Sequence, residues 1–207
     1  MTAQPFWDRV APKYSRKPID DPAAYEKKLA QVSALLQATD HVLEIGCGTG
    51  STALRLAPCV AHYTATDGSR SMIDIARSKL ELDTPTNVTF QQADAVEMVE
   101  GRPFDAVCAF SLLHLVEDVP KVIAIVRKQL KPGGMFISKS VCLKDVPFPI
   151  RAMVNALAFV GIAPRVTFLG EAELVQHLQD ADFEIEQNVH FGKKRMSPFI
   201  VARRSNA

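Results

Sequence analysis

Three glycines at every second position are the first residues in this sequence that could do chemistry. Gly46, Gly48 and Gly50 interrupt an apolar run that begins at Val42. Because glycine has no Cβ and tolerates positive φ, a loop built this way turns sharply and lets its backbone approach a ligand closely. The spacing therefore predicts a nucleotide-type binding loop over residues 44–50.

The glycines alone leave two kinds of ligand open. Counted from Gly46, the dinucleotide fingerprint G-x-G-x-x-G meets Ser51 instead of its last glycine, whereas counted from Gly48 its looser form is completed by Ala53. Glu44, two residues before the first glycine, separates the two ligands, because a carboxylate repels a pyrophosphate and attracts a sulfonium or an amino group. We therefore expect a cationic ligand.

Two aspartates near the ends of strand-like segments extend the predicted site. Asp67 ends the segment HYTATD, and Asp94 follows the segment NVTFQQ. A carboxylate at Asp67 can accept two hydrogen bonds from vicinal ribose hydroxyls, and its charge strengthens them; a turn or capping role beside Gly68 is the alternative. For Asp94, capping a helix that begins near Ala95 is an alternative to ligand binding.

Five stations, which include Asp94 after NVTFQQ, follow one another along the chain in a fixed order. EIGCGTG at 44–50 is followed by HYTATD at 62–67, FDAVCAFSLLHLVED at 104–118 and LKPGGMFI at 130–137. Over about residues 40–143 this series resembles the class I S-adenosylmethionine-dependent methyltransferases, and FWDRVAPKYS near the N-terminus resembles their small-molecule, quinone-biosynthesis-like group. The resemblance implies an α/β fold: a doubly wound, Rossmann-like, seven-stranded and mostly parallel sheet with an antiparallel last strand and helices on both faces.

The resemblance also implies which residues hold the cofactor. Asp94 and Ala95 would meet the adenine, Met72 would pack on the adenine face or belong to the core, and Tyr14 with Arg16 would meet the methionine carboxylate. The full set of expected cofactor contacts is Tyr14, Glu44, Gly46, Cys47, Gly48, Gly50, Asp67, Gly68, Ser69, Met72, Asp94, Ala95 and Ser111.

Methyl transfer from a sulfonium is an in-line displacement that needs no metal, and the chain has no metal-ligand spacing. We therefore expect S-adenosyl-L-methionine as cofactor, S-adenosyl-L-homocysteine as product, and no metal. An oxygen or nitrogen nucleophile can use a general base, and His114, three residues after Ser111, is the catalytic candidate. An orienting or structural histidine is the alternative at this position.

Alternating helical and strand-like patterns place these residues in a single domain. A helix is predicted after Asp21 and Pro22, and another is predicted to begin at Ser71, with Asp74 completing a capping box. We divide residues 1–207 into an N-terminal helical lid (1–38), a cofactor-binding core (40–143), an acceptor-side insertion (144–169), and a C-terminal helix with a β-hairpin (170–207).

The insertion carries the main hint about the methyl acceptor. Its helix is apolar almost all round, so we expect it to be buried, to cover a pocket or to meet a partner. We expect a small lipophilic or aromatic acceptor, with Phe148, Met153 and Phe159 either lining its site or packed in the core. A non-catalytic cofactor-binding regulatory module and an NAD(P)-dependent oxidoreductase remain as alternative functions.

Composition limits the partners of this chain of 207 residues. With 24 Lys and Arg against 23 Asp and Glu, it has no global field that would recruit nucleic acid or an anionic membrane. Its longest apolar run is too short to span a bilayer, and its four cysteines show no C-x-x-C spacing. We expect a cytoplasmic protein with buried free thiols and a small-molecule acceptor; a homodimer stays open.

Overall fold

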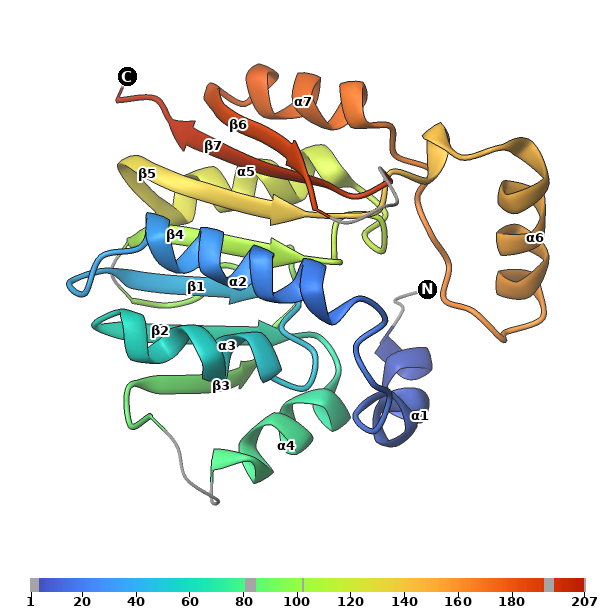
Figure 1. The fold of residues 1–207 in the computed structure, drawn as a ribbon, viewed down its shortest axis with the longest axis horizontal. Helices are drawn as coiled ribbons and strands as arrows, with labels where there is room; N and C mark the ends of the chain where they lie inside the picture. Colours follow the sequence, from blue (N-terminus) through green and yellow to red (C-terminus); the bar gives the residue numbers. More distant parts are fainter. Residues whose placement is uncertain (1–3, 81–84, 102, 192–195, 207) are drawn as a thin grey trace.

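A seven-stranded sheet is the centre of the structure, a computed structural model that describes residues 4–80, 85–101, 103–191 and 196–206 (Figure 1). The strands are β1 (His41–Ile45), β2 (His62–Asp67), β3 (Val88–Gln92), β4 (Phe104–Phe110), β5 (Leu130–Lys139), β6 (Phe183–His190) and β7 (Pro198–Arg204). Their spatial order is β3-β2-β1-β4-β5-β7-β6, and β7 alone runs in the direction opposite to the other six strands. The predicted sheet is confirmed.

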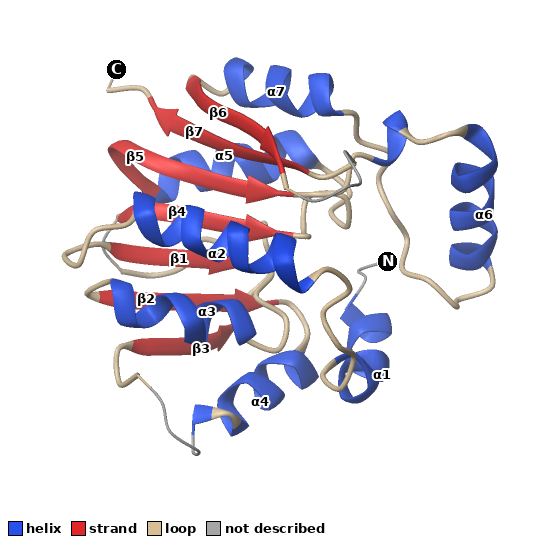
Figure 2. Cartoon of the chain, in the orientation of Figure 1, coloured by secondary structure: helices blue, strands red, loops and turns tan. Residues whose placement is uncertain are grey.

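Helices cover both faces of this sheet (Figure 2). The helices are α1 (Gln4–Tyr14), α2 (Pro22–Leu35), α3 (Ser51–Leu56), α4 (Arg70–Ser78), α5 (Val119–Gln129), α6 (Phe148–Phe159) and α7 (Glu171–Asp180). Successive side chains of a strand point to opposite faces. Val42 accordingly packs in the cluster beneath α2, α3 and α4, whereas its neighbour Leu43 packs in the cluster beneath α5 and α7. Because both faces of the sheet are buried, the strands carry nearly continuous apolar sequences.

The helix starts were predicted with mixed success. The N-cap of α2 is Asp21, whose side chain accepts a hydrogen bond from the Ala24 amide (3.0 Å), as the sequence indicates. The predicted start of α4 at Ser71 is wrong. The N-cap is Ser69, because its Oγ accepts a hydrogen bond from the Met72 amide (3.2 Å), and the helix begins at Arg70.

The helix of the predicted insertion departs from expectation. α6 stands apart from the sheet, at the end of the molecule where the first five strands terminate (Figure 1), and none of its residues is buried. The expectation that this helix is buried is therefore wrong, because its apolar side chains find no core to join. No helix in the described ranges is both long and apolar enough to cross a membrane.

Candidate functional site

A cavity of about 1540 Å³ opens beyond the carboxyl ends of the parallel strands. Doubly wound sheets bind their ligands at this edge, near the point where the strand order reverses, here between β1 and β4. The walls come from α1, α2, the glycine loop, the loops after β2, β3 and β4, and residues between 158 and 167. Of the thirteen predicted cofactor residues, all but Gly50 line it.

The three glycines of the loop, Gly46, Gly48 and Gly50, have different structural roles. All three have positive φ (69°, 54° and 76°), which L side chains rarely adopt. A Cβ on Gly46 would lie 2.7 Å from the Leu112 side chain, and one on Gly50 would lie 2.6 Å from the Phe90 ring. A Cβ on Gly48 would meet nothing closer than the Tyr14 ring at 4.0 Å. Gly46 and Gly50 therefore permit close packing, whereas Gly48 leaves room for a ligand.

Asp67 ties the glycine loop to the loop after β2. Its carboxylate accepts hydrogen bonds from the amides of Gly48 (2.9 Å) and Ser69 (2.8 Å) and lines the cavity. Burial raises the pKa of Asp67, although the two amides oppose this shift. Each carboxylate oxygen keeps further acceptor capacity, so the loop-fixing role and the predicted ribose-binding role are compatible.

Asp94 and Ala95 lie on the cavity wall after β3. The Asp94 carboxylate accepts hydrogen bonds from the Gln4 side chain of α1 (2.8 Å) and from the Val96 amide (3.2 Å). The expected helix near Ala95 is wrong: the backbone forms a turn here, closed by a bond from the Glu97 amide to the Asp94 carbonyl. Met72 is buried and also lines the cavity, so it joins the core to the site.

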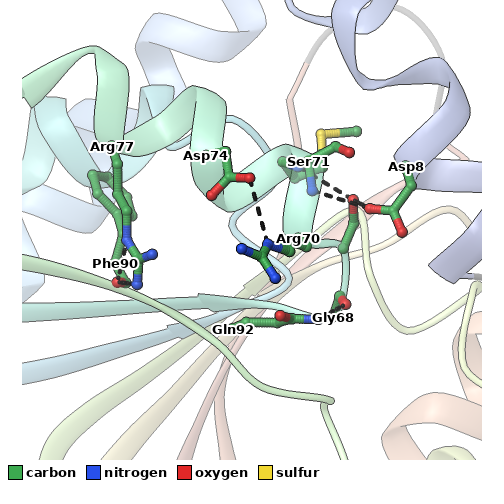
Figure 3. A network of polar contacts seen from close by, with 10 residues as sticks. Asp8, Gly68, Arg70, Ser71, Asp74, Arg77, Phe90 and Gln92 are labelled. Carbon is green, nitrogen blue, oxygen red and sulfur yellow. Dashed lines mark hydrogen bonds and ion pairs between the residues drawn. The ribbon is translucent and has the colours of Figure 1, made fainter.

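The helix α1 closes over the site through an aspartate that the sequence analysis missed. Asp8 accepts hydrogen bonds from the Ser69 hydroxyl (2.6 Å) and the Ser71 amide (3.0 Å) at the start of α4 (Figure 3). These bonds lower the pKa of Asp8, and a carboxylate there is further favoured by the dipole of α4. α1 thereby brings Trp7 and Tyr14 to the cavity, with their rings edge-to-face.

A buried pair of opposite charges lies beneath the glycine loop. Lys28 of α2 is 5% exposed and Glu44 of β1 is 2% exposed, and both line the cavity. The Lys28 ammonium lies over the rings of Phe110 (4.2 Å) and Tyr25 (4.5 Å). No carboxylate of the described residues approaches it within 4.0 Å, although Glu44 is near enough to interact electrostatically.

Burial shifts the pKa of both members of this pair toward neutrality. It raises the pKa of Glu44, which accepts a hydrogen bond from the Tyr63 hydroxyl (3.1 Å), and it lowers the pKa of Lys28, which donates to Thr52 (3.3 Å). A cation and an anion that face one cavity without a direct ion pair are complementary to a zwitterion. Lys28 was missed by the sequence analysis, although it follows Tyr25 at helical spacing on the buried face of α2.

The catalytic candidate from the sequence lies behind the cavity wall. His114 is not among the lining residues; its carbonyl accepts a hydrogen bond from Thr167 (2.8 Å), and burial lowers its pKa to about 4. Such an imidazole is neutral at pH 7 and a weak base. Ser111 lines the cavity with a positive φ of 57°. Across the described ranges, no cluster of three or more His, Cys, Asp or Glu is placed to hold a metal.

Comparison with known proteins identifies similar sequences. A family model described as a methyltransferase domain matches residues 42–134. A demethylmenaquinone methyltransferase of Leptospira interrogans is 36% identical over 106 residues, which are 49% of this chain and 43% of that protein. A ubiquinone biosynthesis O-methyltransferase of Xanthomonas oryzae pv. oryzae is 29% identical over 191 residues, which are 89% of this chain and 77% of that protein. The chain thus matches less than half of the leptospiral protein's length.

The fold is also shared with solved structures. Magnesium protoporphyrin IX methyltransferase from Synechocystis PCC 6803, crystallised with bound SAH, superposes with a TM-score of 0.71 at 20% identity. The superposition covers 97% of this chain and 94% of that one. At this identity the likeness concerns the arrangement of helices and strands alone.

Proposed function

The chain belongs to the class I S-adenosylmethionine-dependent methyltransferases, and we propose that it methylates a small lipophilic acceptor. The printed names of two relatives, one acting on demethylmenaquinone and one in ubiquinone biosynthesis, support an acceptor of quinone type. The cavity agrees with this class, because Phe110, Leu112, Leu115 and Val116 give its wall beyond β4 an apolar character.

The observation that carries the proposal is the set of polar groups around one edge of the cavity. Glu44 and Lys28 would hold the ammonium and carboxylate groups of the cofactor's amino-acid end, in place of the earlier expectation for Arg16, which is not among the lining residues. Asp67 would hold the ribose hydroxyls. Asp94 would take the exocyclic amine of the adenine and Ala95 its ring nitrogen.

The residues present fit such a cofactor. Gly48 leaves open space where a side chain would intrude, and the buried charges of Lys28 and Glu44 lack an ion pair with each other. When bound, the cofactor supplies a methyl group on a sulfonium, which an acceptor atom attacks in line. The chain's own contribution would be to orient the two reactants, while α1 and the apolar wall, which line the cavity, would shield them from water.

The proposal is tested by incubating the protein with methyl-labelled S-adenosylmethionine and a panel of phenols and quinols that carry short isoprenoid tails. We expect label in the extracted acceptor, and an equal amount of S-adenosylhomocysteine. Asp67→Ala serves as the control with weakened cofactor binding, because it removes the proposed ribose contact without changing the acceptor wall. Tight binding of S-adenosylhomocysteine with no transfer to any acceptor would favour the regulatory-module alternative.

A further inference from the structure

The exposed apolar side chains of the molecule gather around α6. We define the α6 patch as Phe148, Ile150, Met153, Phe159, Val160 and Ile162. Phe148 is 77% exposed and Phe159 is 93% exposed, so both aromatic side chains lie largely in solvent. Six of the eleven exposed large apolar side chains in the described ranges belong to this patch. Monomeric proteins rarely gather so many exposed large apolar side chains in one segment unless it has an interaction to make.

The α6 patch continues into the cavity. Ala158 in the last turn of α6 and several residues between Gly161 and Thr167, after the helix, form one wall of the cavity. The Arg9 guanidinium of α1 donates a hydrogen bond to the Gly161 carbonyl (2.9 Å), so the lid and the α6 patch meet beside this wall. Figure 1 shows α1 and α6 at the same end of the molecule, beyond the ends of β1 to β5.

Charge at this end differs from that of the chain as a whole. Residues 146–170 carry Arg151 and Arg165 and no acidic side chain, and residues 4–18 carry four basic side chains and only Asp8 as an acid. These two segments therefore hold six of the 24 basic side chains but only one of the 23 acidic ones. Asp8 is already engaged by Ser69 and Ser71. The nearly neutral total thus conceals an excess of positive charge on these two segments. It is confined to them, because acidic side chains flank them at Asp20, Asp21, Asp145 and Glu171.

We propose that this end docks on an anionic phospholipid bilayer, and that the acceptor enters the cavity from the membrane; the second part rests on the proposed lipophilic acceptor. Exposed aromatic and aliphatic side chains bind at the boundary of headgroups and acyl chains, and basic side chains add attraction to anionic lipids. A second copy of the chain fits less well. In a two-fold dimer the α6 patch would face itself, and the basic side chains of the two copies would repel each other.

The test is co-sedimentation of the full chain with vesicles of phosphatidylcholine alone or mixed with phosphatidylglycerol. We expect the protein to pellet with the mixed vesicles, to pellet weakly with the neutral ones, and to be released as salt rises. The double variant Phe148→Ser/Phe159→Ser should lose about tenfold in partitioning. Met98→Ser, at a position that is 54% exposed but outside both segments, is the control and should bind vesicles unchanged.

Three results would overturn the proposal. The unaltered protein could stay in the supernatant with anionic vesicles, the double variant could bind them as well as the control does, or sedimentation could reveal a dimer that the double variant abolishes. Titration of each variant with S-adenosylhomocysteine separates this question from the proposed function. Retained cofactor binding without vesicle binding contradicts only the docking proposal, whereas vesicle binding without cofactor binding contradicts the proposed function.

Discussion

Replacing Lys28 with methionine should change stability and cofactor affinity in opposite directions. Lys28 is 5% exposed, and burial lowers its pKa. The buried charge therefore lowers the free energy of unfolding. Methionine keeps the length of the side chain and removes the charge. Because the Lys28 charge lowers the pKa of Glu44, its removal lets Glu44 take up a proton rather than remain a bare buried anion. Unfolding free energy should therefore stay constant or rise, by up to about 4 kcal/mol.

Affinity for S-adenosylhomocysteine should fall in the same variant. The proposed contact is a hydrogen bond between an ammonium and a carboxylate, and such bonds are worth about 1.5 to 3 kcal/mol. The dissociation constant should therefore increase by roughly 10- to 150-fold. Isothermal titration measures this change, and thermal unfolding without ligand measures stability on the same samples.

Lys27→Met is the matched control for Lys28→Met. Lys27 is the preceding residue of α2 and is exposed, so its replacement should alter neither quantity by much. If Lys28→Met lost stability and kept its affinity, Lys28 would be a structural residue and the assignment would be refuted. Loss of both quantities would also contradict the reasoning, because it would mean that the buried charge stabilises the fold.

Four further results follow from the same site. Asp67→Ala should weaken S-adenosylhomocysteine binding by about 1.5 to 3 kcal/mol in titration, and an unchanged dissociation constant would sink the ribose assignment. Gly50→Ala should lower the unfolding free energy by about 1 to 3 kcal/mol in a denaturant titration, because its Cβ would lie 2.6 Å from the Phe90 ring; equal stability would contradict this packing. His114→Gln should keep every ionisation in the pH-rate profile, and loss of one would identify the imidazole as the base. The affinity for S-adenosylhomocysteine, measured from about pH 5 to 10, should be highest near neutral pH. Glu44 is protonated on the acid side of this range, and Lys28 loses its proton on the alkaline side. An affinity that does not change with pH would contradict the zwitterion site.

The same pKa shifts predict how the stability of the ligand-free protein changes with pH. Because the folded-state pKa of Glu44 is raised above its ordinary value of 4.5, this group makes the free protein less stable as pH rises from there. Because the folded-state pKa of Lys28 is lowered below 10.5, the cost of its charge is present at neutral pH and disappears as pH rises toward 10.5. Together the two groups make the ligand-free protein least stable between these windows, where both are charged.

The positions of the strands along the chain and the glycine loop could be predicted because both depend on local signals, whereas the arrangement of the strands in one sheet was expected from the family resemblance. An apolar run that ends in Gly46, Gly48 and Gly50 can be recognised from a few neighbouring residues. The start of α4 could not be resolved in this way, because Ser69 and Ser71 are both good capping residues. Only the position of the Ser69 hydroxyl, which accepts from Met72 and donates to Asp8, decides between them.

Residues whose role comes from long-range packing escaped prediction. Asp8 matters because α1 crosses the start of α4, and Lys28 matters because α2 lies over the end of β4. The sequence carried a signal for Lys28, since a lysine beside Leu29 on an apolar helix face must be accounted for. The exposure of α6 had no such signal. The composition of the helix predicts that its apolar side chains pack against something. It does not say whether that is another part of this chain.

The measurement that tests the central claim most directly is a calorimetric titration of the unaltered protein with S-adenosylhomocysteine, followed by a nicotinamide dinucleotide under the same conditions. We expect one saturable site for S-adenosylhomocysteine with a dissociation constant of about micromolar order, and no heat from the dinucleotide. Saturable binding of the dinucleotide, with none of S-adenosylhomocysteine, would contradict the cofactor assignment while leaving the fold unchanged.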